Sequence, residues 1–389
     1  MSKPRIVVVG GGAGGLPLVP RLGRKLGRKG KARIPLVDAN MTHIWKPLLH
    51  EVAAGSLNST EDELNYVAQG KWNHFAFQLG AMTGLDRERR TIQLAAIQDE
   101  KGVELIAPRE LDYDYLVIAV GSTTNDFNTP GAAEHCLFLD TRAQAERFHR
   151  HLLNQYMKAQ ASERGAAREP INVAIIGAGA TGVELSAELH HAAQLLRAYG
   201  FNRISPEDLN INIIEASPRL LPALPERIGG PVTEILRDLG VHLHTGSPVK
   251  EVKADRLILG NGEEIPASLK VWAAGIRAPA FLAGLGMPTN RINQLEVDRT
   301  LKVNGEDRIY AFGDCAACPT DEPGKFVPPR AQAAHQQASL LAKNLRNLLE
   351  DKPQKEYSYR DYGSLISLSS FSAVGNLMGN LTGSVMLEG

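Results

Sequence analysis

Two glycine-rich fingerprints constrain the fold of this chain more than any other feature. The first, Gly10-Gly11-Gly12-Ala13-Gly14-Gly15, follows the β-branched run Ile6–Val9, and the second, Gly177-Ala178-Gly179-Ala180-Thr181-Gly182, follows Val173–Ile176. Each has the spacing GxGxxG, in which a tight turn brings the backbone close to a pyrophosphate and the next helix attracts it with its N-terminus. One copy alone is a weak signal. Two copies, each between a strand pattern and a helix pattern, predict that two dinucleotides bind to one chain.

Bulk properties exclude several other classes of protein. The chain has 389 residues, enough for two or three domains, with 43 Lys plus Arg against 43 Asp plus Glu. This balance predicts no nucleic-acid partner. Three cysteines make no disulfide framework and suit a reducing compartment. The sequence contains no run of about 18 apolar residues, so we expect no membrane span. We also expect no signal peptide before the first strand pattern. We therefore expect a cytoplasmic protein that is at most peripheral to a membrane.

An internal repeat follows the fingerprints. The buried-strand pattern Tyr113–Ser122 closes the first half, and Leu269–Gly275 closes the second in the same way. Each pattern ends near a glycine at the point where the chain is expected to leave the domain. We therefore count Gly121 and Gly275 among the cofactor-binding residues.

Carboxylates are expected at three strand ends. Asp38 ends the second strand pattern and Glu215 ends Leu209–Ile214, positions from which an acid binds an adenosine ribose. Glu215 lies farther from its fingerprint than the usual ~20 residues, which indicates an insertion at 199–208. An acid at Glu215 repels a 2′-phosphate, which favours NADH over NADPH although Arg219 is near. Asp314 follows the strand pattern Ile309–Phe312, where a carboxylate can bind the ribitol hydroxyls of FAD.

The last quarter of the chain changes in character. An apolar stripe at helical spacing follows Pro328 and Pro329, so we expect a helix that begins at Pro329. Residues 362–387 carry no charge and are rich in Ser, Gly and Asn, which favours short strands packed on the protein or on a partner chain. Cys315 and Cys318 form a CxxC pair, but two packed thiols are favoured over a redox pair, and no metal site is expected.

The chain resembles the gammaproteobacterial branch of the type II NADH:quinone oxidoreductases, which are single-subunit respiratory flavoproteins. The stretches that carry the resemblance are Trp45–Leu57, Thr181–Leu189 and Ala331–Gln336. It implies an α/β fold with two Rossmann-like dinucleotide-binding domains, as in glutathione reductase. It also implies non-covalent FAD at the first fingerprint, NADH at the second, and ubiquinone or menaquinone near the helix that contains Gln332.

The resemblance also assigns roles to single residues. Gln332, His335 and Gln336 share one helix face and are expected to contact the quinone. The helix N-terminus at Ala331 is expected to stabilise the reduced flavin. Glu184 is expected to orient the nicotinamide, and His335 and Glu184 are both candidate proton donors. Lys46 is expected to contact the flavin or the quinone. Cofactor binding is further assigned to Gly10, Gly12, Ala13, Gly14, Gly15, Asp38, Gly121, Gly177, Gly179, Thr181, Gly182, Glu215, Gly275 and Asp314.

The resemblance predicts a discontinuous FAD-binding domain at 1–130 and 277–350, and an NADH-binding domain at 131–276. Residues 351–389 are expected to be a truncated membrane-associated or dimerisation segment. The implied protein is a homodimer on the cytoplasmic side of the inner membrane. The implied reaction is ping-pong: hydride passes from NADH to FAD, and two electrons then pass to quinone. Two alternatives remain open, a soluble NADH-dependent ferredoxin-type reductase and an NADH-responsive binding flavoprotein. Pro17 and Pro20 fall in the predicted first helix, where Pro20 should cost a hydrogen bond.

Overall fold

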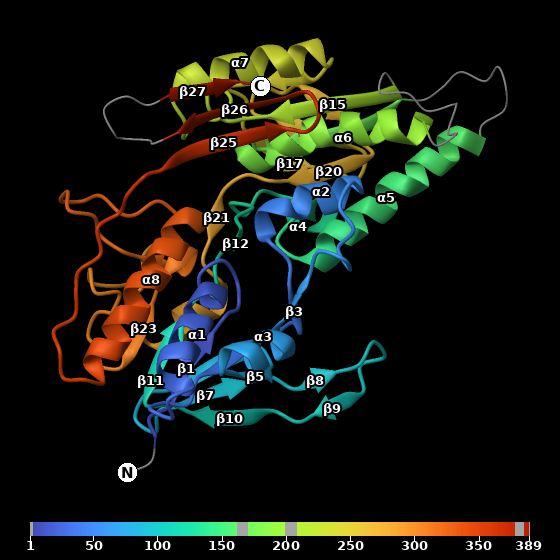
Figure 1. Ribbon diagram of the computed structural model, residues 1–389. Coiled ribbons are helices and arrows are strands. Elements are labelled where there is room, and N and C mark those ends of the chain that lie inside the picture. The colour runs from blue at the N-terminus through green and yellow to red at the C-terminus, as the bar shows by residue number, and fades with distance from the viewer. Residues whose placement is uncertain (1–2, 162–169, 199–207, 378–384, 389) are drawn as a thin grey trace. The chain divides into compact units, whose positions relative to one another are not determined.

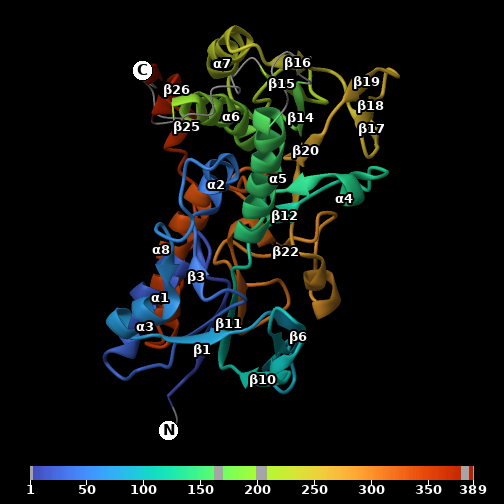
Figure 2. The ribbon, with the colours of Figure 1, turned by 90° about the vertical axis from the view of Figure 1, so that its right-hand side faces the viewer.

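The computed structural model describes residues 3–161, 170–198, 208–377 and 385–388. The chain divides into two compact units, which are drawn from two sides in Figures 1 and 2. Unit 1 comprises Met1–Trp45, Glu63–Thr123 and Ile276–Arg360, and unit 2 comprises Lys46–Asp62, Thr124–Gly275 and Asp361–Gly389. The predicted insertion at 199–208 lies outside the described residues except for Asp208. The predicted three-part domain division stays a prediction.

A five-stranded parallel sheet organises unit 1, in the order β23-β11-β1-β2-β5. Its strands are β1 (Ile6–Val9), β2 (Pro35–Asp38), β5 (Ala76–Leu79), β11 (Tyr115–Ile118) and β23 (Ile309–Ala311). The β1 residues are all buried, as a parallel sheet with both faces covered requires. The carboxyl ends of these strands meet at one edge, and this edge carries the first fingerprint.

Smaller elements complete unit 1. An antiparallel sheet has the order β10-β7-β6, and β3 pairs with β4, β8 with β9 and β22 with β24. The remaining bounds are β3 (Thr42–His43), β4 (Leu64–Asn65), β6 (Met82–Asp86), β7 (Thr91–Leu94), β8 (Ile97–Gln98), β9 (Glu104–Ile106), β10 (Arg109–Asp112), β21 (Ile276–Arg277), β22 (Leu295–Glu296), β24 (Ala316–Ala317), α3 (Tyr66–Asn73), η4 (Ala280–Leu285) and η5 (Gly313–Cys315).

The helix after the first fingerprint contains the predicted irregularity. Helix α1 spans Gly15–Leu22 with Pro20 inside it, and a π-helical turn, η1 (Gly23–Gly27), continues it. Proline has no N–H, so the carbonyl of Leu16 lacks its ordinary helical donor at this position. Helix α8 (Ala331–Leu348) packs against α1. The expected start of α8 at Pro329 is wrong: both prolines precede the helix, and Arg330 is its extended N-cap residue.

Unit 2 repeats the parallel-sheet design. Its sheet has the order β13-β20-β14-β15-β16, built from β13 (Leu137–Phe138), β14 (Ile171–Ile176), β15 (Leu209–Ile214), β16 (His242–His244) and β20 (Leu269–Trp272). All the strand pairs in it are parallel. The second fingerprint follows β14, just as the first follows β1. With unit 1, this confirms the predicted fold class of two Rossmann-like domains.

The other elements of unit 2 cover this sheet and extend it. The described residues 363–377 and 385–388 form the short antiparallel strands expected from their composition, and β25 packs on α6 while β26 packs on α7. The bounds are η2 (Lys46–Leu48), α2 (Leu49–Ala54), α4 (Ala132–His135), α5 (Arg142–Ala161), α6 (Ala180–Ala198), α7 (Glu226–Asp238), β17 (Val249–Val252), β18 (Arg256–Leu259), β19 (Glu264–Pro266), β25 (Gly363–Leu368), β26 (Ser372–Leu377) and β27 (Val385–Glu388), while β12 (Thr123–Thr124) straddles the unit boundary.

Candidate dinucleotide-binding sites

The two glycine cradles are built alike, residue for residue. Gly10 has φ +97° and Gly177 has φ +105°, a region that L side chains rarely adopt. A Cβ at Gly15 would collide with the Gly10 carbonyl, and one at Gly182 would collide with the Gly177 carbonyl. These glycines therefore allow each turn to close tightly against its own helix.

The middle glycine of each cradle faces open space. A Cβ at Gly12 or at Gly179 would meet no protein atom within 4 Å. Neither position needs glycine for packing. The open space beside a helix N-terminus fits the close approach of a pyrophosphate. Both cradles therefore have room for the pyrophosphate of a dinucleotide.

An acid supports each cradle from the neighbouring strand. Asp38 Oδ2 accepts a hydrogen bond from the Gly11 N–H at 2.7 Å, and Glu215 Oε2 accepts one from the Ala178 N–H at 2.8 Å. The second oxygen of Asp38 accepts from Asn40 N at 2.8 Å, and that of Glu215 accepts from Ser217 N at 2.8 Å. The two predicted ribose-binding acids therefore occupy equivalent positions at the carboxyl ends of β2 and β15.

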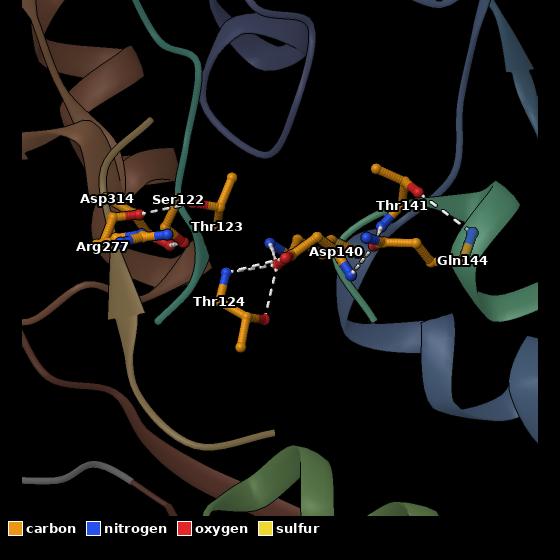
Figure 3. A network of polar contacts seen from close by, with 9 residues as sticks. Ser122, Thr123, Thr124, Asp140, Thr141, Gln144, Arg277 and Asp314 are labelled. Carbon is orange, nitrogen blue, oxygen red and sulfur yellow. Dashed lines mark hydrogen bonds and ion pairs between the residues drawn. The ribbon is translucent and has the colours of Figure 1, made fainter. Parts of the chain in front are cut away.

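Asp314 lies at the same edge of the unit 1 sheet, after β23. Its Oδ2 accepts a hydrogen bond from the Ser122 hydroxyl at 2.9 Å, as Figure 3 shows. Gln337, buried in α8, accepts from the Gly313 N–H at 2.8 Å and so ties the loop that carries Asp314 to that helix. Gly121, beside Ser122, has φ +70° and open space at its Cβ position.

The other predicted cofactor-binding residues differ in what they contact. A Cβ at Gly14 would collide with the Phe312 ring, and one at Gly275 would collide with the Phe127 ring. Both glycines therefore allow close packing. Three further residues stand at helix starts: Ala13 in the turn before α1, Thr181 in the first turn of α6, and Ala331 at the first residue of α8. Their cofactor contacts stay predictions.

Lys46 belongs to a polar network in unit 2. Its Nζ lies 3.0 Å from Asp140 Oδ1, and Asp140 also accepts hydrogen bonds from the N–H and hydroxyl of Thr124. Gln144 accepts from the N–H groups of Asp140 and Thr141, which caps the start of α5 (Figure 3). The predicted contact of Lys46 to a flavin or quinone stays a prediction.

Glu184 lies in a cluster of ionisable groups in unit 2. Its Oε1 accepts a hydrogen bond from the Ser367 N–H at 3.2 Å, and its Oε2 lies 4.0 Å from His50 Nδ1. Burial, reinforced by the charge of Glu51, raises the pKa of Glu184 to about 7. Burial also lowers the pKa of His50, whose Nδ1 donates to the Pro47 carbonyl at 2.8 Å. The cluster can hold a proton on a carboxyl near neutral pH.

The polar residues of α8 point to two different neighbours. Gln332 Oε1 accepts from the Tyr359 hydroxyl at 3.1 Å, and Gln336 Nε2 donates to the Arg360 carbonyl at 2.7 Å. His335 Nε2 instead lies 3.4 Å from Arg21 of α1. Burial and the charge of Arg21 lower the pKa of His335, so its ring is neutral at pH 7. The two glutamines thus face the segment 357–360, and the histidine faces α1.

The two cysteines of the CxxC pair are packed in the protein interior, as predicted from the sequence. Cys315 and Cys318 are free and buried. Burial raises the pKa of Cys315 to about 11 and that of Cys318 to about 12. Both are therefore thiols at neutral pH, and thiols are poor nucleophiles compared with thiolates.

Sequence reasoning missed His50 and Gln337. His50 stands inside the Trp45–Leu57 stretch, but only the packing of α2 on α6 brings it to Glu184. Gln337 follows Gln336 directly, and nothing in the sequence marks it as the residue that anchors the Asp314 loop. Both act through tertiary contacts that a local pattern does not encode.

Two parallel-sheet units, each with a glycine cradle and a strand-end acid, define a protein of the two-dinucleotide-binding class. Residues 4–338 match the pyridine nucleotide-disulphide oxidoreductase family. The type II NADH:quinone oxidoreductase of Haemophilus influenzae is 45% identical over 385 residues, covering 96% of this chain and 86% of that protein. The Staphylococcus aureus enzyme of the same name is 28% identical over 383 residues, covering 97% and 90%.

A solved structure agrees in fold. NDH2 from Plasmodium falciparum, determined in complex with NADH, superposes with a TM-score of 0.84 at 20% sequence identity, covering all of this chain and 92% of that one. The chain therefore belongs to the type II NADH:quinone oxidoreductases within the pyridine nucleotide-disulphide oxidoreductase family. The family resemblance inferred from the sequence is confirmed.

Proposed function

We propose that this chain oxidises NADH and reduces a membrane quinone through bound, non-covalent FAD, without pumping protons. The observation that carries the proposal is the duplicated cradle, Gly12 with Asp38 and Gly179 with Glu215, in one chain. The 45% identity to a curated NADH:quinone oxidoreductase supports the choice of electron donor and acceptor. When bound, FAD supplies the hydride-accepting centre and the two-electron donor that amino-acid side chains lack.

Unit 1 is the proposed FAD site. Asp38 would hold the adenosine ribose, and the backbone beside Gly12 would hold the pyrophosphate at the N-terminus of α1. Asp314 would accept hydrogen bonds from the ribitol hydroxyls, with Ser122 and Gln337 fixing the position of its loop. The N-terminus of α8 at Ala331 would stabilise negative charge on the reduced cofactor.

Unit 2 is the proposed NADH site, and its charges favour NADH over NADPH. Glu215 would hold the adenosine ribose and repel a 2′-phosphate. Arg219, the nearby cation, donates to the carbonyls of Leu221, Pro222 and Leu224 at 3.2, 2.9 and 2.8 Å. The guanidinium therefore uses its donors on its own loop and is less available to bind a 2′-phosphate.

The proposed quinone contacts lie on α8, and they need protons as well as electrons. Gln332 and His335 remain candidates for hydrogen bonding to a quinone carbonyl. The side-chain amide of Gln336 is engaged with Arg360, so we assign it to positioning the segment 357–360. Glu184 and His335 are the two candidate proton donors: the pKa of Glu184, in unit 2, is raised to about 7, whereas that of His335, on α8, is lowered.

The proposed setting is the cytoplasmic side of the inner membrane, with the protein peripheral and homodimeric. No helix in the described ranges is both long and apolar enough to cross a bilayer. A lipid-soluble acceptor, ubiquinone or menaquinone, requires contact with the membrane surface. Residues 351–389, which include the uncharged strands β25 and β26, are the proposed membrane-associated or dimerisation segment.

Steady-state kinetics with different acceptors test this function against its rivals. We expect NADH oxidation with ubiquinone-1 or menadione to exceed by far the rate with a ferredoxin. Faster turnover with the iron–sulfur protein would favour the ferredoxin-type reductase. Slow turnover with every acceptor, together with an NADH-dependent change in size, would favour the binding flavoprotein.

A further inference from the structure

A groove of about 760 Å³ lies between α1, α3 and α8, entirely within unit 1. Figures 1 and 2 show these three helices beside one another on one side of the unit 1 sheet. The helix contacts agree, because α1 packs against both α3 and α8. The groove runs along α1 and α8 and includes His335, one of the proposed quinone contacts, whereas the proposed FAD contacts are the glycine turn before α1 and Ala331 at the start of α8.

The groove is strongly cationic in a protein with no formal net charge. No aspartate or glutamate is among the residues that line it. Within the described ranges, none of its five Lys and Arg side chains forms an ion pair with a carboxylate. These five are Arg21, Arg24, Lys25, Lys343 and Arg346.

The positive charges also crowd one another. Lys355 and Arg346 lower the pKa of the Lys343 ammonium, because neighbouring positive charges disfavour its charged form. Two of the guanidinium groups are held in place: Arg21 donates to the Pro17 carbonyl at 2.6 Å and Arg24 donates to Asn73 at 2.7 Å. The groove therefore concentrates positive charge, two members of which are held by hydrogen bonds, and its lining contains no acidic residue.

Apolar surface accompanies this charge. The groove walls include Leu16, Pro17, Pro20 and Ala342. At its rim, Leu64 is 45% exposed. Trp72 is 70% exposed and lies three residues after Gln69, a groove-lining residue, so the two share a helix side. A cationic cluster beside exposed tryptophan and leucine is the composition of surfaces that rest in a membrane interface.

We propose that this groove binds the phosphate headgroup of an anionic phospholipid, with Trp72 and Leu64 at the boundary between headgroups and acyl chains. A soluble anion would use the cations but not the apolar walls and exposed tryptophan. The proposal depends on the proposed function in one respect: a quinone reductase must reach the membrane that holds its lipid-soluble acceptor.

Vesicle co-sedimentation without NADH or quinone tests the proposal, so that its failure is separable from failure of the redox function. The purified holoprotein is mixed with phosphatidylcholine vesicles, with and without phosphatidylglycerol. We expect binding to the anionic vesicles, and weakening of that binding between about 0.1 M and about 1 M salt. Equal binding to both kinds of vesicle would overturn the proposal.

Two charge-reversal variants locate the surface. The double variant Lys343→Glu with Arg346→Glu should lower the partition coefficient at least about tenfold, since each cation near an anionic surface contributes roughly a factor of five. The matched control, Lys101→Glu with Lys250→Glu, changes the net charge equally at two exposed positions outside the groove. Equal losses in both variants would show that only net charge matters and would overturn the site.

A second pair of variants tests the apolar rim. Trp72→Ala should weaken vesicle binding, whereas Leu105→Ala, on the β8–β9 hairpin and 64% exposed, should leave it unchanged. The flavin spectrum and NADH oxidation with ferricyanide, a water-soluble acceptor, show that each variant is folded. Oligonucleotide binding that is lost in the Lys343 and Arg346 variant, without any vesicle binding, would assign the groove to nucleic acid and overturn the proposal.

Discussion

The carboxylate of Asp38 accepts a hydrogen bond from the backbone N–H of Gly11 at 2.7 Å, which links the end of β2 to the glycine turn after β1. The same acid is the proposed ligand of the adenosine ribose. Asp38 therefore has two roles, one within the protein and one toward FAD.

Asp38→Ala should lower the affinity for FAD roughly 10- to 100-fold, the contribution of a hydrogen bond to a charged group. The ratio of flavin to protein absorbance after dialysis measures this loss. The control is Asp86→Ala, which removes an acid that also accepts a backbone hydrogen bond, from Arg89, in the same unit. A full flavin content in the Asp38 variant would refute the assignment.

Glu215→Gln should raise the KM for NADH about tenfold and narrow the preference for NADH over NADPH. Glutamine can still accept the hydrogen bond from Ala178, so the cradle keeps its shape while the charge is lost. Steady-state kinetics with both nucleotides measure the effect, and the flavin content serves as the control. An unchanged ratio of kcat/KM values for the two nucleotides would contradict the proposed repulsion of the 2′-phosphate.

Gly12→Ala should abolish FAD binding without destabilising the apoprotein, because the added Cβ meets no protein atom and projects toward the proposed pyrophosphate. Gly15→Ala should instead prevent folding, since its Cβ collides with the Gly10 carbonyl. Thermal unfolding followed by circular dichroism and the flavin content together distinguish the two outcomes. Retention of FAD by a folded Gly12 variant would show that the open space is not the cofactor cradle.

Glu184→Gln should change the pH dependence of stability. Burial raises the pKa of Glu184 from 4.5 to about 7, so the folded protein binds this proton more tightly than the unfolded chain. The stabilisation is full below about pH 4.5 and is lost as pH rises through 7. Wild type should therefore lose on the order of 3 kcal/mol more than the variant between about pH 5 and about pH 8, as measured by urea unfolding.

The same variant tests the role of Glu184 as a proton donor. If Glu184 donates a proton, quinone reduction should slow in the wild type as pH rises through 7. In Glu184→Gln it should be slow and flat over this range. Parallel pH profiles in the two proteins would leave Glu184 with the nicotinamide-orienting role alone.

The double variant Cys315→Ala with Cys318→Ala should oxidise NADH at the wild-type rate, within about twofold. The two thiols are buried and their pKa values are raised, so neither is suited to redox exchange. NADH:quinone activity before and after the substitution measures this. A loss of activity with an intact flavin spectrum would assign the pair a redox role.

The cradles and their acids could be predicted from the sequence because each depends on a short, local pattern. A strand, a glycine turn and a helix fix Gly10 and Gly177, and the next strand end fixes Asp38 and Glu215. The surroundings of α8 could not be predicted in this way. The hydrogen bonds from Gln332 and Gln336 to the segment 357–360 join residues that are separated in sequence and carry no shared motif.

The start of α8 shows a second limit. A proline suits the first turn of a helix, so the sequence predicts a start at Pro329, yet the helix begins at Ala331 after an extended Arg330. The two prolines form the approach to the helix instead. Similarly, the contact between His50 and Glu184 depends on the packing of α2 against α6, which no single stretch encodes.

Anaerobic stopped-flow spectroscopy of the yellow holoprotein tests the central claim most directly. NADH should bleach the flavin absorbance in one rapid phase, and ubiquinone-1 or menadione, mixed in afterwards, should restore it at a rate compatible with turnover. A flavin that NADH leaves unreduced, or that quinones leave bleached, would contradict the claim that this chain joins the two half-reactions.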